Sequence, residues 1–277
     1  MTRTIDAHQH FWRLGHFDDA WLFDPARKVL CADHVPADLA PQIEAAGVDA
    51  TIAVQTQHDV AETRWMLELA SANDWIAGVV GWVDLRSPDC GQQLDSLAAD
   101  PKFVGVRHIT QDEADPDFIV REDVARGLRE LERRSVPFDL QFYAEHLRHA
   151  PHLARSFPDL PLVIDHLSKP KIEAGEIDTW TRELRDAARY PNVHCKVSGM
   201  VTEAGANWNT ATLAPYVRVA LDAFGPERCM FGSDWPVCRL AASYAEVHEA
   251  ALELLVELSA AERAAVLGGT AARFYGV

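Results

Sequence analysis

The segment IDAHQH, residues 5–10, is the stretch of sequence that most clearly indicates the fold. Ile5 opens a candidate strand, and His8 and His10 follow two residues apart at its end. Residues two apart on a strand share a face, so both imidazoles can converge on one point. The segment therefore predicts a first strand that ends in a pair of histidines suited to a metal ion.

Two later apolar runs also end in acidic or imidazole side chains. Asp165 and His166 follow the run 162–164, and Asp234 follows the run 230–231. Histidines and carboxylates at strand ends, far apart in sequence, predict one site at one end of a barrel. A distant histidine and aspartate would complete a set of nitrogen and oxygen ligands that leaves a position for water.

Strand-like and helix-like segments alternate over almost the whole chain. The short apolar runs suit parallel strands buried on both faces, and Asp59 with Glu62 resembles the start of a capped helix. We predict a single TIM-type (β/α) barrel domain over residues 1–277, with room for distortion in one strand. Residues 11–33 have no clear period and predict a long loop over the barrel mouth. The expected strands after the first are 50–55, 76–83, 103–109, 138–142, 162–166, 193–198 and 229–234.

Composition restricts the partners and the setting. The formal net charge is −16, which argues against nucleic acid or an anionic membrane as a partner. No apolar stretch is long enough to span a bilayer, and no apolar signal region precedes the first strand. Five cysteines without tight spacing predict packing residues rather than disulfides. We therefore expect a soluble cytoplasmic protein, and the sequence leaves its oligomeric state open.

Three motifs carry a resemblance to a known family. They are DAHQHFW at 6–12, IDHLSKP at 164–170 and FGSDWP at 231–236. Together and in this order they resemble the amidohydrolase superfamily, and more narrowly its lactonase branch. Within that branch the chain looks most like L-fuconolactonases, with L-rhamnonolactonases close behind. The resemblance implies a hydrolase of sugar catabolism that opens a small sugar lactone, L-fucono-1,5-lactone or a close aldonolactone, to the aldonic acid.

The chain departs from the two-metal pattern of that superfamily. The expected fourth and fifth strands, 103–109 and 138–142, lack the bridging lysine or glutamate and the histidine that such centres use. We therefore expect at most one divalent ion, zinc given histidine and aspartate ligands. The expected ligands are His8, His10 and Asp234, with His166 as a candidate fourth. Some relatives in this branch are thought to work without metal, so the need for the ion stays open.

The chemistry of lactone opening assigns roles to four side chains. Asp234 is the expected base that takes a proton from water, and a crowded site can raise its pKa toward the working pH. His166 would orient Asp234 or the substrate carbonyl. Arg107 or His108 would donate to the developing oxyanion, and Arg107 could also hold the product carboxylate.

Sugar contacts are expected from residues near the strand ends. Trp12, Trp82 and Trp235 could stack on the sugar ring, although burial in the core explains them equally well. Gln55, like Gln57 and His58, could bind sugar hydroxyls or cap the next helix.

Each of these assignments has a structural alternative. Asp234 could cap a helix, His166 could be a core histidine, and Arg107 could pair with a neighbouring carboxylate. Lys196, in the expected seventh strand, could point inward or form a structural salt bridge, and the salt bridge is favoured. Two other functions stay open: a metal-dependent decarboxylase of an aromatic or unsaturated acid in the same superfamily, and a non-catalytic sugar-binding barrel.

Overall fold

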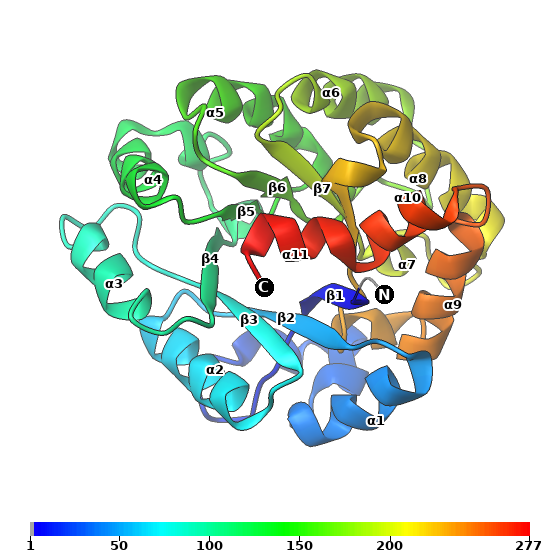
Figure 1. The fold of residues 1–277 in the computed structure, drawn as a ribbon, viewed down its shortest axis with the longest axis horizontal. Coiled ribbons are helices and arrows are strands. Elements are labelled where there is room, and N and C mark those ends of the chain that lie inside the picture. Colours follow the sequence, from blue (N-terminus) through cyan, green and yellow to red (C-terminus); the bar gives the residue numbers. More distant parts are fainter. Residues whose placement is uncertain (1–2) are drawn as a thin grey trace.

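Eight parallel strands pair in sequence order, from β1 to β8. The structure is a computed structural model and describes residues 3–277. A parallel bridge between Gln9 of β1 and Trp235, in the segment after β8, brings the two edges of the sheet together into a nearly closed barrel, and helices surround it (Figure 1). The predicted TIM-type barrel is confirmed. The strands are β1 (Ile5–Gln9), β2 (Ala50–Val54), β3 (Ile76–Gly81), β4 (Phe103–His108), β5 (Phe138–Leu140), β6 (Leu162–Ile164), β7 (Val193–Val197) and β8 (Cys229–Phe231).

The helices lie outside the barrel, except that α11 crosses its N-terminal end (Figure 1). None of the helices described in residues 3–277 combines the length and apolar character needed to cross a membrane. The helices are α1 (Pro36–Ala46), α2 (Val60–Ala72), α3 (Cys90–Leu97), α4 (Glu122–Arg134), α5 (Ala150–Ser156), α6 (Asp178–Ala188), α7 (Met200–Glu203), α8 (Thr210–Phe224), α9 (Tyr244–Leu254), α10 (Ala260–Ala264) and α11 (Thr270–Tyr275).

Apolar side chains form separate cores inside and outside the sheet. The larger core lies between the strands and the surrounding helices. The smaller one includes Ile5, Val80 and Met230 from the strands together with Ala271 and Tyr275 from α11. Helix α11 thus covers the N-terminal end of the barrel, which leaves the C-terminal ends of the strands as the place for a site.

Several strands end earlier than the sequence predicts. β6 ends at Ile164 rather than at 166, and β8 ends at Phe231 rather than at 234. In both cases the next residues turn sharply: His166 has φ 52° and Asp234 has φ 58°. The segments that carry the expected site residues therefore leave the sheet just before those residues.

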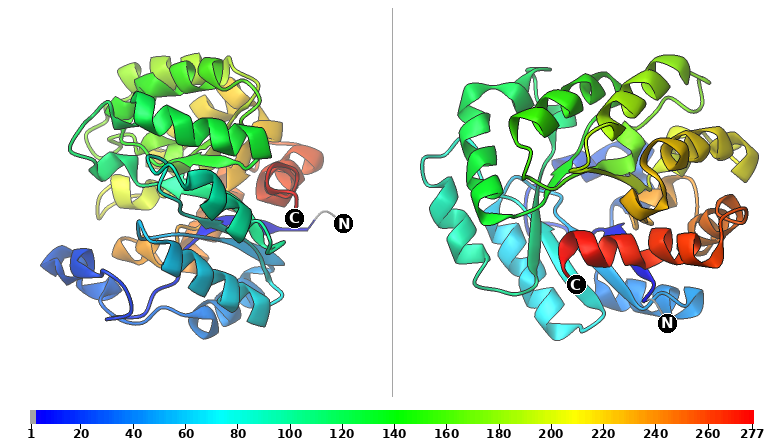
Figure 2. Two further views of the ribbon diagram at one scale, coloured as in Figure 1. Left: turned by 90° about the vertical axis from the view of Figure 1, so that its left-hand side faces the viewer. Right: turned by 45° about the horizontal axis from the view of Figure 1, so that its top comes forward.

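The segment after β1 forms the predicted long loop. It contains two short 3-10 helices, Ala20–Phe23 and Pro25–Leu30, and an antiparallel bridge joins Trp12 to His34. Figure 2 shows this blue segment at the end of the barrel away from the two termini. It lies at the same end as the C-terminal ends of the strands.

Candidate active site

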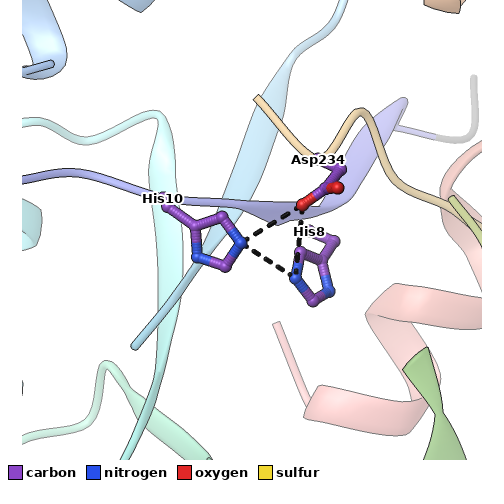
Figure 3. A group of neighbouring side chains, drawn as sticks. All are labelled: His8, His10 and Asp234. Carbon is purple, nitrogen blue, oxygen red and sulfur yellow. Dashed lines mark hydrogen bonds and ion pairs between the residues drawn. The ribbon is translucent and has the colours of Figure 1, made fainter. Parts of the chain in front are cut away.

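Three side chains from opposite ends of the chain meet at the mouth of the barrel (Figure 3). The Nε2 atoms of His8 and His10 are 3.2 Å apart. Asp234 Oδ1 lies 3.3 Å from Nε2 of His10 and 4.0 Å from Nε2 of His8. All three residues are buried. The structure thus brings together the three residues that the sequence suggested as metal ligands.

His166 lies beside this group. Its Nε2 is 3.8 Å from Oδ1 of Asp234, and its Nδ1 is 2.9 Å from the hydroxyl of Ser198. Gly199 packs directly on the ring, where a Cβ atom would lie 2.5 Å from Nδ1 of His166. Because Gly199 also has φ 63°, a glycine is needed there both for space and for backbone conformation.

The proton positions on His10 follow from its partners. Its Nδ1 lies 2.7 Å from the carbonyl oxygen of Val54, which can only accept, so Nδ1 carries the proton. Burial lowers the pKa of His10, so the ring is neutral at pH 7. Nε2 of His10 therefore presents a lone pair to the carboxylate of Asp234. Nε2 of His10 and Oδ1 of Asp234 are thus two acceptors 3.3 Å apart, an arrangement that is favourable only with a cation or a proton donor between them.

The donor set fits a divalent metal ion. Ligand atoms about 2.0–2.1 Å from a tetrahedral zinc ion lie about 3.3 Å from one another. The distances of 3.2, 3.3 and 4.0 Å among His8, His10 and Asp234 are close to that value. His8, His10 and Asp234 could therefore hold one ion, with His166 near enough to be a fourth ligand.

Asp6 joins the two segments that carry these ligands. Its Oδ1 accepts hydrogen bonds from the backbone N–H of His8 and of Ser233, at 3.1 and 2.9 Å. The backbone N–H of Asp234 in turn donates to the carbonyl of His8 at 2.8 Å. The pairing of β1 with β2 is irregular between Asp6 and Gln9, at the point where His8 enters the site.

The pKa of Asp234 is lower than the sequence suggested. Burial acts to raise it, but the adjacent imidazoles of His166 and His10 outweigh burial and bring the pKa below its ordinary value of 3.8. The expectation of a raised pKa is therefore wrong. The carboxylate is ionised at neutral pH and can accept a proton without first losing one.

Arg107 lies next to the site, but protein groups take up most of its donors. Its Nη1 is 2.5 Å from Oε1 of Gln141, 3.2 Å from Oδ2 of Asp165 and 3.2 Å from Nε2 of His8. Its Nη2 donates to the carbonyl of Gln55, whose side chain donates back to the carbonyl of Arg107 at 3.1 Å. These contacts leave Arg107 and Gln55 few donors for a substrate.

Sequence reasoning allowed a salt bridge for Lys196 but missed the buried ionic network next to the histidines to which it belongs. Lys196 Nζ lies 2.6 Å from Oδ2 of Asp139, 3.0 Å from Oδ1 of Asp165 and 3.1 Å from Nδ1 of His8. The hydroxyl of Tyr275, from α11, donates to Asp139 at 2.9 Å. A signal was available, because a lysine inside a strand expected to be buried on both faces needs a partner.

His108 belongs to a second cluster at the rim. Its Nδ1 accepts from Nε1 of Trp82 at 3.2 Å, so Nε2 carries the proton and donates to Glu113 at 2.7 Å. His58 stacks on His108 with ring centroids 4.1 Å apart, and its own Nε2 accepts from the backbone of Ile109. Both nitrogens of His108 are therefore engaged, whereas Trp82 and the exposed His58 border the mouth.

Trp12 and Trp235 are both packed within the protein. Trp12 is 4% exposed, lies against Leu22 and Leu30, and donates from Nε1 to the carbonyl of Ala32 at 2.9 Å. Trp235 is 1% exposed, with its ring edge-on to that of Phe11. The structure thus places these two tryptophans in the packing around the loop after β1.

Comparison with known proteins agrees with this geometry. A family model described as amidohydrolase matches residues 5–277. The chain belongs to the amidohydrolase family. It is 40% identical to an L-fucono-1,5-lactonase of Burkholderia ambifaria over 99% of this chain and 96% of that protein. It is 42% identical to an L-fucono-1,5-lactonase of Burkholderia multivorans, over 98% and 95%. A crystal structure of an amidohydrolase from Burkholderia multivorans with bound zinc superposes with a TM-score of 0.92, at 41% identity over 99% of both chains.

Strands four and five of this amidohydrolase contribute to the ionic network. β4 carries Arg107 and β5 carries Asp139, which the sheet register places opposite each other. Arg107 contacts Asp165, and Lys196 contacts both carboxylates. These contacts give Asp139 and Asp165 cationic partners within the protein, next to the position of His8.

Proposed function

We propose that this amidohydrolase opens an aldonolactone, L-fucono-1,5-lactone or a close relative, to the aldonic acid. The observation that carries the proposal is the convergence of the Asp234 carboxylate with three buried neutral histidines at the strand ends. The lactonase relatives, at 40–42% identity over nearly the whole chain, supply the substrate class. A lactonase needs a base that activates water and hydrogen-bond donors for the carbonyl oxygen. Residues at the C-terminal ends of the strands can supply both.

Asp234 is the base in this mechanism. The oxygen of a water molecule attacks the lactone carbonyl carbon while Asp234 accepts the proton that the water loses. The carbonyl electron pair moves onto oxygen, and its return breaks the ring C–O bond. The proton held by Asp234 then passes to the leaving alkoxide. One water is consumed, and a hydroxy acid is formed.

The histidines position these partners. His8 and His10, together with Asp234, would hold one divalent ion, which we propose to be zinc. When bound, such an ion polarises the carbonyl or lowers the pKa of water. His166, fixed between Ser198 and Gly199, faces Asp234 and orients its carboxylate. Val54 fixes His10 so that its Nε2 lone pair faces the site.

A proton-release assay tests the function. Wild-type protein and the Asp234→Asn variant are incubated with a panel of aldonolactones in a weakly buffered pH indicator, with and without a chelator. We expect acid release by the wild type with L-fucono-1,5-lactone among the best substrates, and release near the spontaneous rate with the variant. Acid release must occur without carbon dioxide, which separates a lactonase from a decarboxylase. Spontaneous rates with every lactone would refute the proposal.

A further inference from the structure

A left-handed turn follows β6. Four consecutive residues other than glycine have positive φ: His166, Leu167, Ser168 and Lys169, at 52°, 55°, 58° and 47°. For residues other than glycine this conformation is less favourable than the right-handed one, because it brings Cβ too close to the following carbonyl oxygen. The turn is held by Nε1 of Trp180, which donates to the carbonyl of Leu167 at 2.7 Å. Strain of this kind is typical of segments that must place side chains for function.

His166, the first residue of the turn, faces Asp234. Lys169, the last, is partly buried, and its Nζ lies 5.4 Å from the centre of the Tyr143 ring. Burial lowers the pKa of Lys169, and the charges of Asp234 and Glu203 act against that effect. The charge of Asp234, the expected base, thus acts on the ammonium group of Lys169.

The ammonium of Lys169 differs from the two neighbouring cations. Lys196 and Arg107 are both bound to carboxylates. Within residues 3–277, by contrast, no carboxylate oxygen lies within 4.0 Å of Lys169 Nζ, and no hydrogen-bond acceptor is in reach. A partly desolvated ammonium without an acceptor is costly, and an incoming oxygen would relieve that cost.

We propose that Lys169 is the oxyanion donor of the reaction and also binds the carboxylate of the product. The proposal rests on the proposed lactonase function. As water attacks, the carbonyl electron pair moves onto oxygen, and an N–H of Lys169 donates to that oxygen without transferring its proton. Asp234 holds the proton from water, the ring C–O bond breaks, and the alkoxide takes that proton. The ammonium then contacts a carboxylate oxygen of the open acid.

Lys169 replaces Arg107 and His108, which the sequence suggested as oxyanion donors. Both nitrogens of His108 already have partners, Trp82 and Glu113. The guanidinium of Arg107 is committed to Gln141, Asp165 and the carbonyl of Gln55. Lys169 keeps its three N–H donors free within the described part of the chain.

The test compares Lys169→Gln and Lys169→Arg with the control Lys171→Gln. Lys171 is exposed, and its Nζ lies 3.7 Å from Glu176. We expect Lys169→Gln to lower kcat about 10²–10³-fold, as when one oxyanion donor is removed, and to weaken inhibition by the aldonate product about tenfold. Lys169→Arg should recover part of both, and Lys171→Gln should match the wild type. Circular dichroism and thermal unfolding check that each variant is folded.

The outcomes separate the two proposals. If the wild type opens no lactone, the proposed function fails and this assignment fails with it. If the wild type is active and folded Lys169→Gln keeps kcat and product inhibition within about threefold, the lactonase function stands and Lys169 is not the donor.

Discussion

The ammonium of Lys196 lies 2.6 Å from Oδ2 of Asp139, and both side chains are completely buried. Lys196 also contacts Asp165, which reaches Arg107 at 3.2 Å. Two cations and two carboxylates therefore balance one another directly below His8. Burial alone would raise the pKa of Asp165, but Lys196, His8 and Arg107 together hold it well below its ordinary range. The histidines of the site thus lie next to a buried group of charges that neutralise one another.

The first prediction concerns these buried charges. Lys196→Met should lower the free energy of unfolding by about 3–5 kcal/mol, because it leaves buried Asp139 and Asp165 without their ammonium. Urea unfolding measures the change. Lys196→Met combined with Asp139→Leu should recover part of the loss, and exposed Lys171→Met should have almost no effect. If Lys196→Met were as stable as the wild type, the ionic network would contribute nothing to the free energy of unfolding.

The second prediction concerns the base. Asp234→Asn keeps the size of the side chain but cannot accept a proton from water, so kcat should fall about 10²–10⁴-fold with little change in stability. Because its pKa lies below 3.8, we expect the wild-type rate to fall only as the pH approaches that region and the carboxylate becomes protonated. Steady-state kinetics over a range of pH measure both effects.

Exposed Asp186→Asn is the matched control for this substitution. If Asp234→Asn kept more than about a tenth of the wild-type kcat, another group would have to be the base, with His166 the next candidate.

The third prediction concerns the metal. We expect one equivalent of a divalent ion or less, because His8, His10 and Asp234 form one ligand set, whereas Lys196 and Arg107 neutralise Asp165 beside it. Elemental analysis of protein purified without added metal measures the content. His10→Asn should abolish the bound ion, and His194→Asn, on β7 outside this cluster, should not. Two tightly held equivalents would contradict the single site.

The sequence predicted the parts of this site that follow from strand order. In a parallel barrel, residues just after strands come together, so His8, His10, His166 and Asp234 could be grouped without coordinates. Which residues of a strand point inward is harder to predict. The pairing irregularity between Asp6 and Gln9 shows that simple alternation does not hold throughout β1. For Lys196, likewise, the sequence leaves an inward position and a structural salt bridge both open, and its contact with His8 was not predicted.

Partners of long side chains were also hard to predict. For Arg107 the sequence leaves substrate binding and pairing with a carboxylate both open. Its contacts depend on Gln55 and Gln141, just after β2 and β5, which no local pattern specifies. For Trp12 the sequence leaves stacking on a sugar and burial in the core both open. The loop after β1 folds back so that His34 pairs with Trp12 through the backbone, and this buries the indole.

The last prediction concerns the stability of that loop in acid. His34 is 2% exposed and lies edge-on to the rings of Trp12 and Trp235, and its Nε2 has no partner within the described chain. Burial, together with Arg239, lowers the pKa of His34 from 6.5 to about 4. The unfolded chain therefore binds this proton more readily than the folded protein. The contribution of His34 to stability is complete above pH 6.5 and is lost as the pH falls toward 4.

Urea unfolding of wild type and His34→Gln at about pH 7.5 and about pH 4.5 measures this contribution. The wild type should lose about 1–2 kcal/mol more than the variant between these two conditions, after allowance for solvent screening near the loop. Histidines elsewhere titrate equally in both proteins, and so does buried Glu62, whose pKa burial raises to about 7 and which acts in the opposite direction. The difference between the two proteins therefore isolates His34. Equal losses in both would show that the folded loop accepts the proton as readily as the unfolded chain.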